Sequence, residues 1–258
     1  MQDLEKYILR IADSSLILSH RLSEWCSKGP TLEEDIAISN ISLDLLGRAN
    51  SLLEYCSKVN GNKSADDLAF KRDEREFYNF QICELENGHF GDTIIRQFLF
   101  DSYASLFFKK LSESKDETLS AIALKSIKEI NYHLRHSSNW VIRLGDGTKL
   151  SKEKIQDSLN KIWKYTGEFF EMDELDNEML KKQIGVDNKK LKNQWDIIVN
   201  ETLEKAKLNR PEDGFMMTGS KNGIHTELLG KILSEMQYIP RAYPVSYTHL
   251  TLPTILLV

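Results

Sequence analysis

Ile127-Lys-Glu-Ile-Asn-Tyr-His-Leu-Arg135 is the stretch of this sequence that decides the predicted fold. It lies on a strongly periodic helix, on which Glu129 and Tyr132, three residues apart, share one face. In four-helix bundles that hold two metal ions, this spacing belongs to a Glu-x-x-His pair that points into the core. Here a tyrosine stands where that pattern has a histidine. The stretch therefore predicts such a bundle with an incomplete ligand set.

An earlier helix carries the matching positions. Moving back 85 positions from Glu129 leads to Asp44, with Gly47 three residues later, where the same pair is expected again. That pair also lacks its histidine. The other two ligands of such a centre come from the partner helices, and reflection of each pair across its hairpin turn gives Leu16 and Asp101. The six ligand positions thus retain three carboxylates.

The surviving side chains are too few for a two-iron centre. Oxygen activation at such a centre uses about four carboxylates and two imidazoles. Leu16 has no lone pair, Gly47 has no side chain, and the Tyr132 phenol is a poor ligand for ferrous iron. We therefore expect no catalytic, cofactor-binding or metal-binding residue in this chain, and we interpret the six positions as vestiges of a metal site.

The residue after Tyr132 leaves two interpretations open. As a ligand, His133 would add one imidazole; as a surface residue, it belongs with Arg135 and His136 on a polar helix face, which we expect. Carboxylates buried without a metal need hydrogen bonds or a counter-charge. The sequence offers Tyr132 or a nearby cation, with Arg48 as one candidate, for that role.

Apolar periodicity and helix caps predict two helical hairpins. Thr31 with Glu34 and Ser114 with Glu117 have the spacing of a capping box, which opens a helix. Gly29-Pro30 and Gly61-Asn62 are expected to end the first two helices. The four long helices are expected at residues 4–28, 31–60, 92–108 and 114–145.

The rest of the chain surrounds these hairpins. Residues 66–86 are expected to form a helical or partly irregular crossover, and further helices are expected at 151–170, 188–208 and 224–238. An acidic stretch, 171–178, and a loop, 210–223, separate these helices. The fold class is therefore all-α, a ferritin-like four-helix bundle with additional C-terminal helices, in a single domain of residues 1–244. At the loop-to-helix junction 221–227, exposed amides and Lys221 would bind a phosphate, or the polar side chains would cap the helix; we favour capping.

Composition limits the possible functions. The chain of 258 residues has a net charge of -5, which argues against nucleic acid as a partner because phosphate binding needs a basic surface. Its three cysteines show no CxxC pattern and suit a reduced compartment. Because residues 1–10 include charged side chains, we expect neither a signal peptide nor a membrane anchor there. We expect a cytoplasmic protein. No nucleotide-binding, serine-hydrolase or zinc-protease motif occurs.

Several segments resemble one protein family. Over roughly residues 3–243, the chain is similar to the C-subunit family of bacterial ring 1,2-phenylacetyl-CoA epoxidases. The segments that carry the resemblance are Leu22-Ser-Glu-Trp25, Ile41-Ser-Leu-Asp-Leu-Leu-Gly47, Leu68-Ala-Phe-Lys-Arg-Asp-Glu-Arg75, Ile127-Lys-Glu-Ile-Asn-Tyr-His-Leu-Arg135 and Gly223-Ile-His-Thr-Glu-Leu-Leu-Gly230.

The resemblance implies an iron-free structural subunit of a multicomponent oxygenase. It implies a homologous A subunit as partner, which carries the di-iron centre, binds phenylacetyl-CoA and epoxidises its ring with O2. It also implies a separate reductase subunit with NADPH, flavin and iron–sulfur cofactors, in aerobic phenylacetate breakdown. The surviving carboxylates keep one alternative open, an autonomous di-iron carboxylate oxygenase or iron oxidase. Four aromatic residues are candidates either for supporting the partner or for the core of the bundle: Phe98, Phe100, Phe107 and Phe108.

One stretch departs from the family pattern. Residues 245–258, Val-Ser-Tyr-Thr-His-Leu-Thr-Leu-Pro-Thr-Ile-Leu-Leu-Val, are apolar, β-type in composition and free of charge. We interpret this segment as a non-native tail, so the functional interpretation excludes it.

Overall fold

The computed structural model describes residues 2–243, which contain nine α-helices and no strand. The all-α, ferritin-like fold class is thereby confirmed. The helices are α1 (Gln2–Ser23), α2 (Leu32–Asn60), α3 (Ala65–Phe70), α4 (Phe90–Leu111), α5 (Glu117–Gly145), α6 (Lys149–Ile162), α7 (Glu174–Lys181), α8 (Asn188–Lys205) and α9 (Glu227–Ala242). Five short 3-10 helices lie at Glu74–Glu76, Gln81–Glu84, Trp163–Tyr165, Gly167–Phe170 and Ser220–Asn222.

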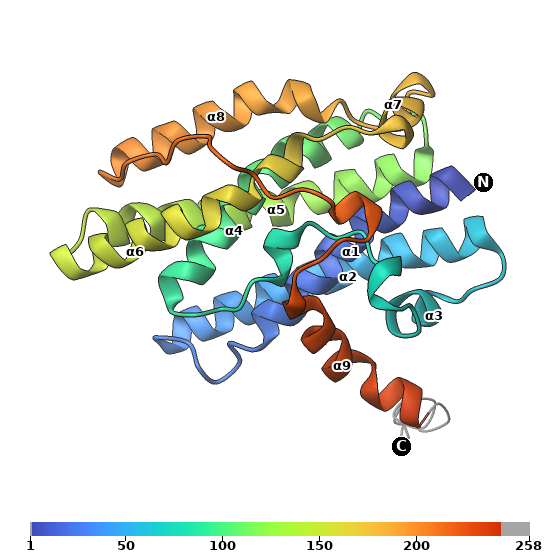
Figure 1. Ribbon diagram of the computed structural model, residues 1–258, viewed down its shortest axis with the longest axis horizontal. Helices are drawn as coiled ribbons and strands as arrows, with labels where there is room; N and C mark the ends of the chain where they lie inside the picture. Colours follow the sequence, from blue (N-terminus) through green and yellow to red (C-terminus); the bar gives the residue numbers. More distant parts are fainter. Residues whose placement is uncertain (1, 244–258) are drawn as a thin grey trace, which may run out of the picture.

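Four long helices form the bundle. Helix α1 packs along α2 and α4 packs along α5, and α2 contacts α5, which joins the two hairpins (Figure 1). The α1–α2 register is marked by the Ser42 hydroxyl, which donates to the Ser19 carbonyl oxygen at 2.7 Å. The crossover between α2 and α4 contains α3 and two 3-10 helices, so the expected partly irregular connection is confirmed.

Helix ends follow local chemistry, with three corrections. The first helix, expected to end at Gly29-Pro30, ends at Ser23. Gly61 ends α2 in the left-handed region, at φ 76°, as its lack of a side chain allows. The N-cap of α4 is His89, whereas Asp92, expected to be the cap, is in the first turn and accepts from the His89 backbone N–H. The N-cap of α5 is Asp116 and not Ser114, because the Asp116 carboxylate accepts from Leu119 N–H.

The C-terminal helices cover one side of the bundle. Helices α6 and α8 lie beside α4 and α5, and α9 extends from the bundle next to α3 and α1 (Figure 1). The stretch 171–178 is not merely a separator, because it contains most of α7, which opens with a capping box between Asp173 and Asp176. An ion pair of 3.0 Å from Arg10 to Asp176 fixes α7 against α1.

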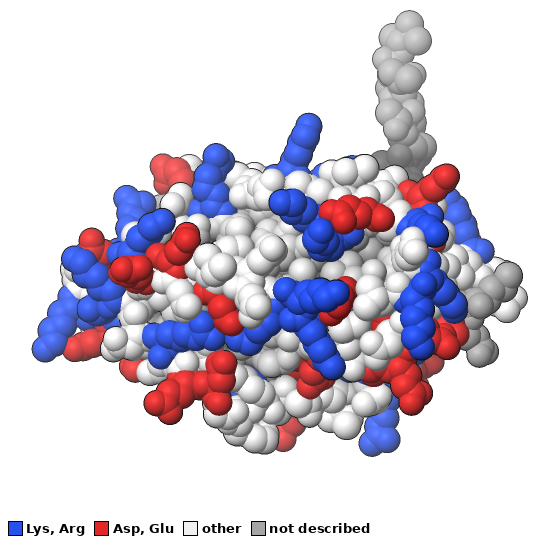
Figure 2. Space-filling model, turned by 90° about the horizontal axis from the view of Figure 1, so that it is seen from above, with Lys and Arg blue, Asp and Glu red and all other residues white. Residues whose placement is uncertain are grey.

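The surface carries mixed charge. On the face seen in Figure 2, Lys and Arg side chains alternate with Asp and Glu side chains, so this face offers phosphate groups no continuous basic area. None of the helices in residues 2–243 has the length and apolar character needed to cross a membrane. All three cysteines are free. The predicted non-native tail, 245–258, lies outside the described residues.

Candidate functional site

A buried arginine lies at the centre of the bundle, among the surviving carboxylates. Arg48 projects from α2, and its guanidinium lies 3.9 Å from the Glu129 carboxylate on α5 and 4.8 Å from the centre of the Phe108 ring on α4. Burial lowers the pKa of Arg48 to about 10, although the charges of Glu129, Asp101 and Asp44 act in the opposite direction. The guanidinium nevertheless stays charged at neutral pH. The bundle centre therefore holds a positive charge supplied by the chain itself.

Asp101 is the most deeply buried of these carboxylates. Its side chain, on α4, is 1% exposed and accepts two hydrogen bonds, from the Gln97 amide at 2.7 Å and the Ser137 hydroxyl at 2.9 Å. Burial raises the pKa of Asp101 to about 7, even though both hydrogen bonds and the Arg48 charge favour the ionised form. Asp101 is thus partly protonated at neutral pH. Burial also raises the pKa of Glu129, and the Arg48 charge opposes this rise.

His133, and not Tyr132, turns toward the bundle interior. The His133 side chain is buried, and its Nε2 atom lies 2.9 Å from the Asp44 carboxylate on α2. Burial lowers the pKa of His133 to about 4, against the effect of Asp44. A neutral imidazole therefore donates through Nε2 to Asp44 at neutral pH. The expectation that His133 lies on a polar face was wrong.

The neighbouring residues explain this register. Tyr132 is 40% exposed, and its ring stacks on His136 at 6.3 Å, outside the charge cluster. His136 in turn bonds Glu34 of α2 at 2.8 Å, so the Glu34 carboxylate serves a contact between helices. Two residues were expected as partners of the carboxylates. Arg48 is such a partner, whereas Tyr132 does not contact them.

Besides Tyr132, two of the six predicted positions lie outside this cluster. Leu16 and Gly47 line an open groove between α2 and α3, on the outer side of the bundle. Asp101 contacts Ser137, which lies two turns beyond Glu129 on α5. The structure brings Asp44, Asp101 and Glu129 around Arg48, but does not bring all six positions together.

The donor groups of this cluster do not fit a two-iron centre. Protein groups engage each carboxylate: Gln97 and Ser137 engage Asp101, His133 engages Asp44, and Arg48 engages Glu129. Within residues 2–243, no three side chains of His, Cys, Asp or Glu gather where they could hold a metal ion. The expectation that this chain has no metal or cofactor of its own stays a prediction.

The aromatic residues of α4 belong to the core. All four candidates for partner contact are buried, and Phe107 stacks on Tyr103 at 5.5 Å inside the bundle. These four rings are therefore not accessible to a partner at the surface. The buried set is Phe98, Phe100, Phe107 and Phe108.

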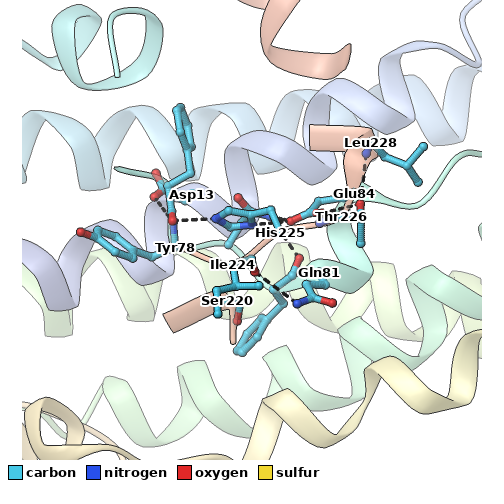
Figure 3. Close-up of polar contacts among 12 residues, drawn as sticks. Asp13, Tyr78, Gln81, Glu84, Ser220, Ile224, His225, Thr226 and Leu228 are labelled. Atoms are coloured by element: carbon cyan, nitrogen blue, oxygen red, sulfur yellow. Dashed lines mark hydrogen bonds and ion pairs between the residues drawn. The ribbon is translucent and has the colours of Figure 1, made fainter. Parts of the chain in front are cut away.

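A second polar network fastens the C-terminal segment to the crossover (Figure 3). The buried Glu84 carboxylate lies 2.6 Å from His225 Nδ1 and accepts from the backbone N–H and the hydroxyl of Thr226, at 2.8 and 2.6 Å. Thr226 is also the N-cap of α9. Lys221 is buried, donates to the Glu171 carbonyl oxygen at 2.7 Å and pairs with Asp176. The junction therefore caps a helix, as expected, and its lysine is not exposed for phosphate.

Sequence reasoning missed Gln97, Ser137 and the inward direction of His133. The one available signal was on α5, where Glu129, His133 and Ser137 follow each other at intervals of four residues. Such a polar line beside buried apolar residues indicates a satisfied interior cluster. A Glu-x-x-His template, with its spacing of three, does not detect it.

The sequence matches one known protein family over nearly its whole length. The model of a family described as "Phenylacetic acid catabolic protein" matches residues 1–246. A relative from Escherichia coli (strain K12), the C subunit of 1,2-phenylacetyl-CoA epoxidase, is 46% identical over 244 residues, which cover 95% of this chain and 98% of that protein. Because both matches span nearly the whole chain, this chain belongs to the phenylacetic acid catabolic protein family.

Proposed function

We propose that this chain is a non-catalytic structural subunit of a multicomponent oxygenase that epoxidises the ring of phenylacetyl-CoA in aerobic phenylacetate breakdown. The name of the E. coli relative supports the enzyme and the substrate. The partner is a homologous catalytic subunit that carries the di-iron centre. A reductase subunit with NADPH, flavin and iron–sulfur cofactors supplies the electrons.

One observation carries the non-catalytic role: Arg48 lies among the carboxylates that remain of the ligand set. A fixed guanidinium repels divalent cations and already supplies the positive charge that metal ions would bring. Its removal from the cluster would leave the buried Asp101 and the half-buried Asp44 and Glu129 without this counter-charge, which is costly for a buried carboxylate. The chain therefore stabilises its bundle centre without iron.

The hydrogen bonds of the cluster support the same interpretation. A metal ligand must offer a free lone pair, and ligand carboxylates are ionised. Asp101 has both oxygens engaged and a pKa raised to about 7 by burial. The proton on Asp101 and the donor groups around it compete with metal binding.

The decisive experiment separates assembly from catalysis. The purified catalytic subunit and the reductase are mixed, with and without this chain, and assayed for phenylacetyl-CoA epoxidation and for complex formation by size exclusion. We expect a stable complex that buries more than about 2,000 Å², no epoxidation by the isolated chain, and higher activity of the complex. Equal activity of the catalytic subunit alone, without complex formation, would refute the proposal.

Iron loading tests the rival function, an autonomous di-iron oxygenase or iron oxidase. The isolated chain is incubated anaerobically with ferrous iron, desalted and analysed for metal. Tight retention of about two irons per chain would contradict the structural role. The matched control is the double variant Asp101→Asn, Glu129→Gln: iron held at the cluster would be lost in it, whereas iron bound at surface carboxylates would remain.

A further inference from the structure

Helix α2 is apolar on two opposite faces. Its inner face packs on α1 through buried residues that include Ile38, Leu45 and Leu52. Its outer face exposes Leu32 at 72% and Leu43 at 63%. A helix that is apolar on both sides is normally covered on both sides. Among residues 2–243, α3 borders part of this outer face, yet the large apolar side chains of the face stay exposed.

The exposed residues follow a coiled-coil spacing. Intervals of four, three, four, three and four residues connect them, which is the alternation of the two core positions in a heptad repeat. Four of the six are large and apolar. We call this set, in which Ser39 is half-buried and the other five residues are exposed, the outer seam: Leu32, Ile36, Ser39, Leu43, Leu46 and Asn50. On α5 and α8, the exposed leucine and isoleucine, Leu124 and Ile197, stand singly, as on ordinary surfaces.

Gly47 adds an independent observation. It is exposed in the middle of α2, where glycine destabilises a helix relative to alanine. A Cβ atom added to Gly47 would meet no atom within 4 Å, so packing inside this chain does not require the glycine. A backbone that approaches closely from another chain would require it. Gly47 also lines the groove between α2 and α3, which has a volume of about 430 Å³ and an apolar floor of Leu16 and Leu53.

Charge around the outer seam indicates the chemistry of its partner. Glu33, Glu54 and Asp66 are exposed and border the seam and groove. An acidic border disfavours an anionic membrane, because helices that lie on such membranes carry Lys and Arg beside their apolar face. It suits a protein helix with an apolar seam and basic flanking residues.

We propose that the outer seam of α2 binds an amphipathic helix of the catalytic partner subunit, with Gly47 at the point of closest helix approach. This inference rests on the proposed function, because it names the surface through which the structural subunit holds its partner. The packing is of the knobs-into-holes kind, in which Leu43 and Leu46 insert between side chains of the partner helix.

The test measures binding of the catalytic subunit to variants of the full chain. We expect the double variant Leu43→Lys, Leu46→Lys to raise the dissociation constant at least tenfold, and Gly47→Gln to weaken binding as well. The matched control is Leu124→Lys, an equally exposed leucine on α5, for which we expect binding within twofold of wild type. Urea midpoints equal to or above that of wild type will show that these surface variants are folded.

Four outcomes would overturn the inference. Wild-type affinity of the double variant, while wild type binds, would remove the outer seam from the interface but leave the proposed function intact. A wild-type dimer in light scattering that the double variant dissociates would assign the seam to a second copy of this chain. Flotation of wild type, but not of the double variant, with phosphatidylcholine–phosphatidylglycerol vesicles would assign it to a membrane. Failure of wild type to bind the catalytic subunit would refute this inference and the proposed function together.

Discussion

Replacement of Asp101 by asparagine is expected to stabilise the protein at alkaline pH. Burial raises the pKa of Asp101 from an ordinary value of 3.8 to about 7, so the folded state holds a proton that the unfolded state releases above pH 4. The contribution of the Asp101 carboxyl to the free energy of unfolding is fully present below pH 4 and is lost as the pH rises to 7. The full loss corresponds to about 4 kcal/mol. Solvent screening does not reduce this energy, because the Asp101 side chain is 1% exposed.

The asparagine side chain keeps the shape of the site and removes the titration. It can accept from Gln97 and donate to Ser137, whose hydroxyl also bonds the His133 carbonyl oxygen. Urea unfolding at pH 5, 6, 7 and 8 should show the stability of Asp101→Asn, relative to wild type, rising by about 3 kcal/mol from pH 5 to pH 8. The control Asp157→Asn, at an exposed position of α6, should show no such trend. A constant difference between Asp101→Asn and wild type across this range would refute the buried, proton-holding carboxyl.

Three further substitutions test the same description. Burial lowers the pKa of His133 to about 4, below the unfolded value of 6.5, so the free energy of unfolding of wild type should fall by up to about 3 kcal/mol as the pH drops from 6.5 to 4. His133→Leu should not show this loss of stability in urea unfolding. An equal loss in acid for both proteins would contradict the buried, neutral imidazole. Tyr132→Phe should change stability by less than about 0.5 kcal/mol, because Tyr132 is exposed and stacks on His136; a loss above about 1 kcal/mol in the same assay would mean that its hydroxyl has a buried partner. Gly47→Ala should stabilise the isolated chain by about 0.5–1 kcal/mol, seen as a melting temperature about 1–4 °C higher. A lower melting temperature would show that Gly47 is needed within the chain itself.

The large elements of this fold could be read from periodicity, but some of their first residues could not. Gly61 and the Gly145-Asp146-Gly147 stop were correct because the loss of helical pattern and the glycine coincide. Asp92 was mistaken for a cap because an acidic residue is favourable both at the cap and in the first turn. Only the backbone of His89 distinguishes the two positions, and a sequence does not display it.

The side-chain contacts of the candidate site were harder to predict from the sequence than the helices. Positions three and four residues after Glu129 lie on nearly the same face of α5, so Tyr132 and His133 were equally good candidates for the interior. The choice depends on where α2 places Asp44, which no pattern within α5 contains. Likewise, reflection across the second hairpin turn assumed equal helix lengths, and the true partner of Asp101 is Ser137. Pairing between helices is a tertiary property, and a local spacing rule does not determine it.

The Glu84 network also orders events during synthesis. Three of the four hydrogen bonds that reach the Glu84 carboxylate come from His225 and Thr226, which the ribosome adds 141 and 142 residues later. At a synthesis rate of about 5–20 residues per second, these partners are added roughly 7–30 seconds after Glu84. Until then, burial of the carboxylate is too costly, and the segment that carries it must stay in water. The nascent chain can therefore form its two hairpins early, but the native crossover closes only after His225 and Thr226, just before α9, have emerged.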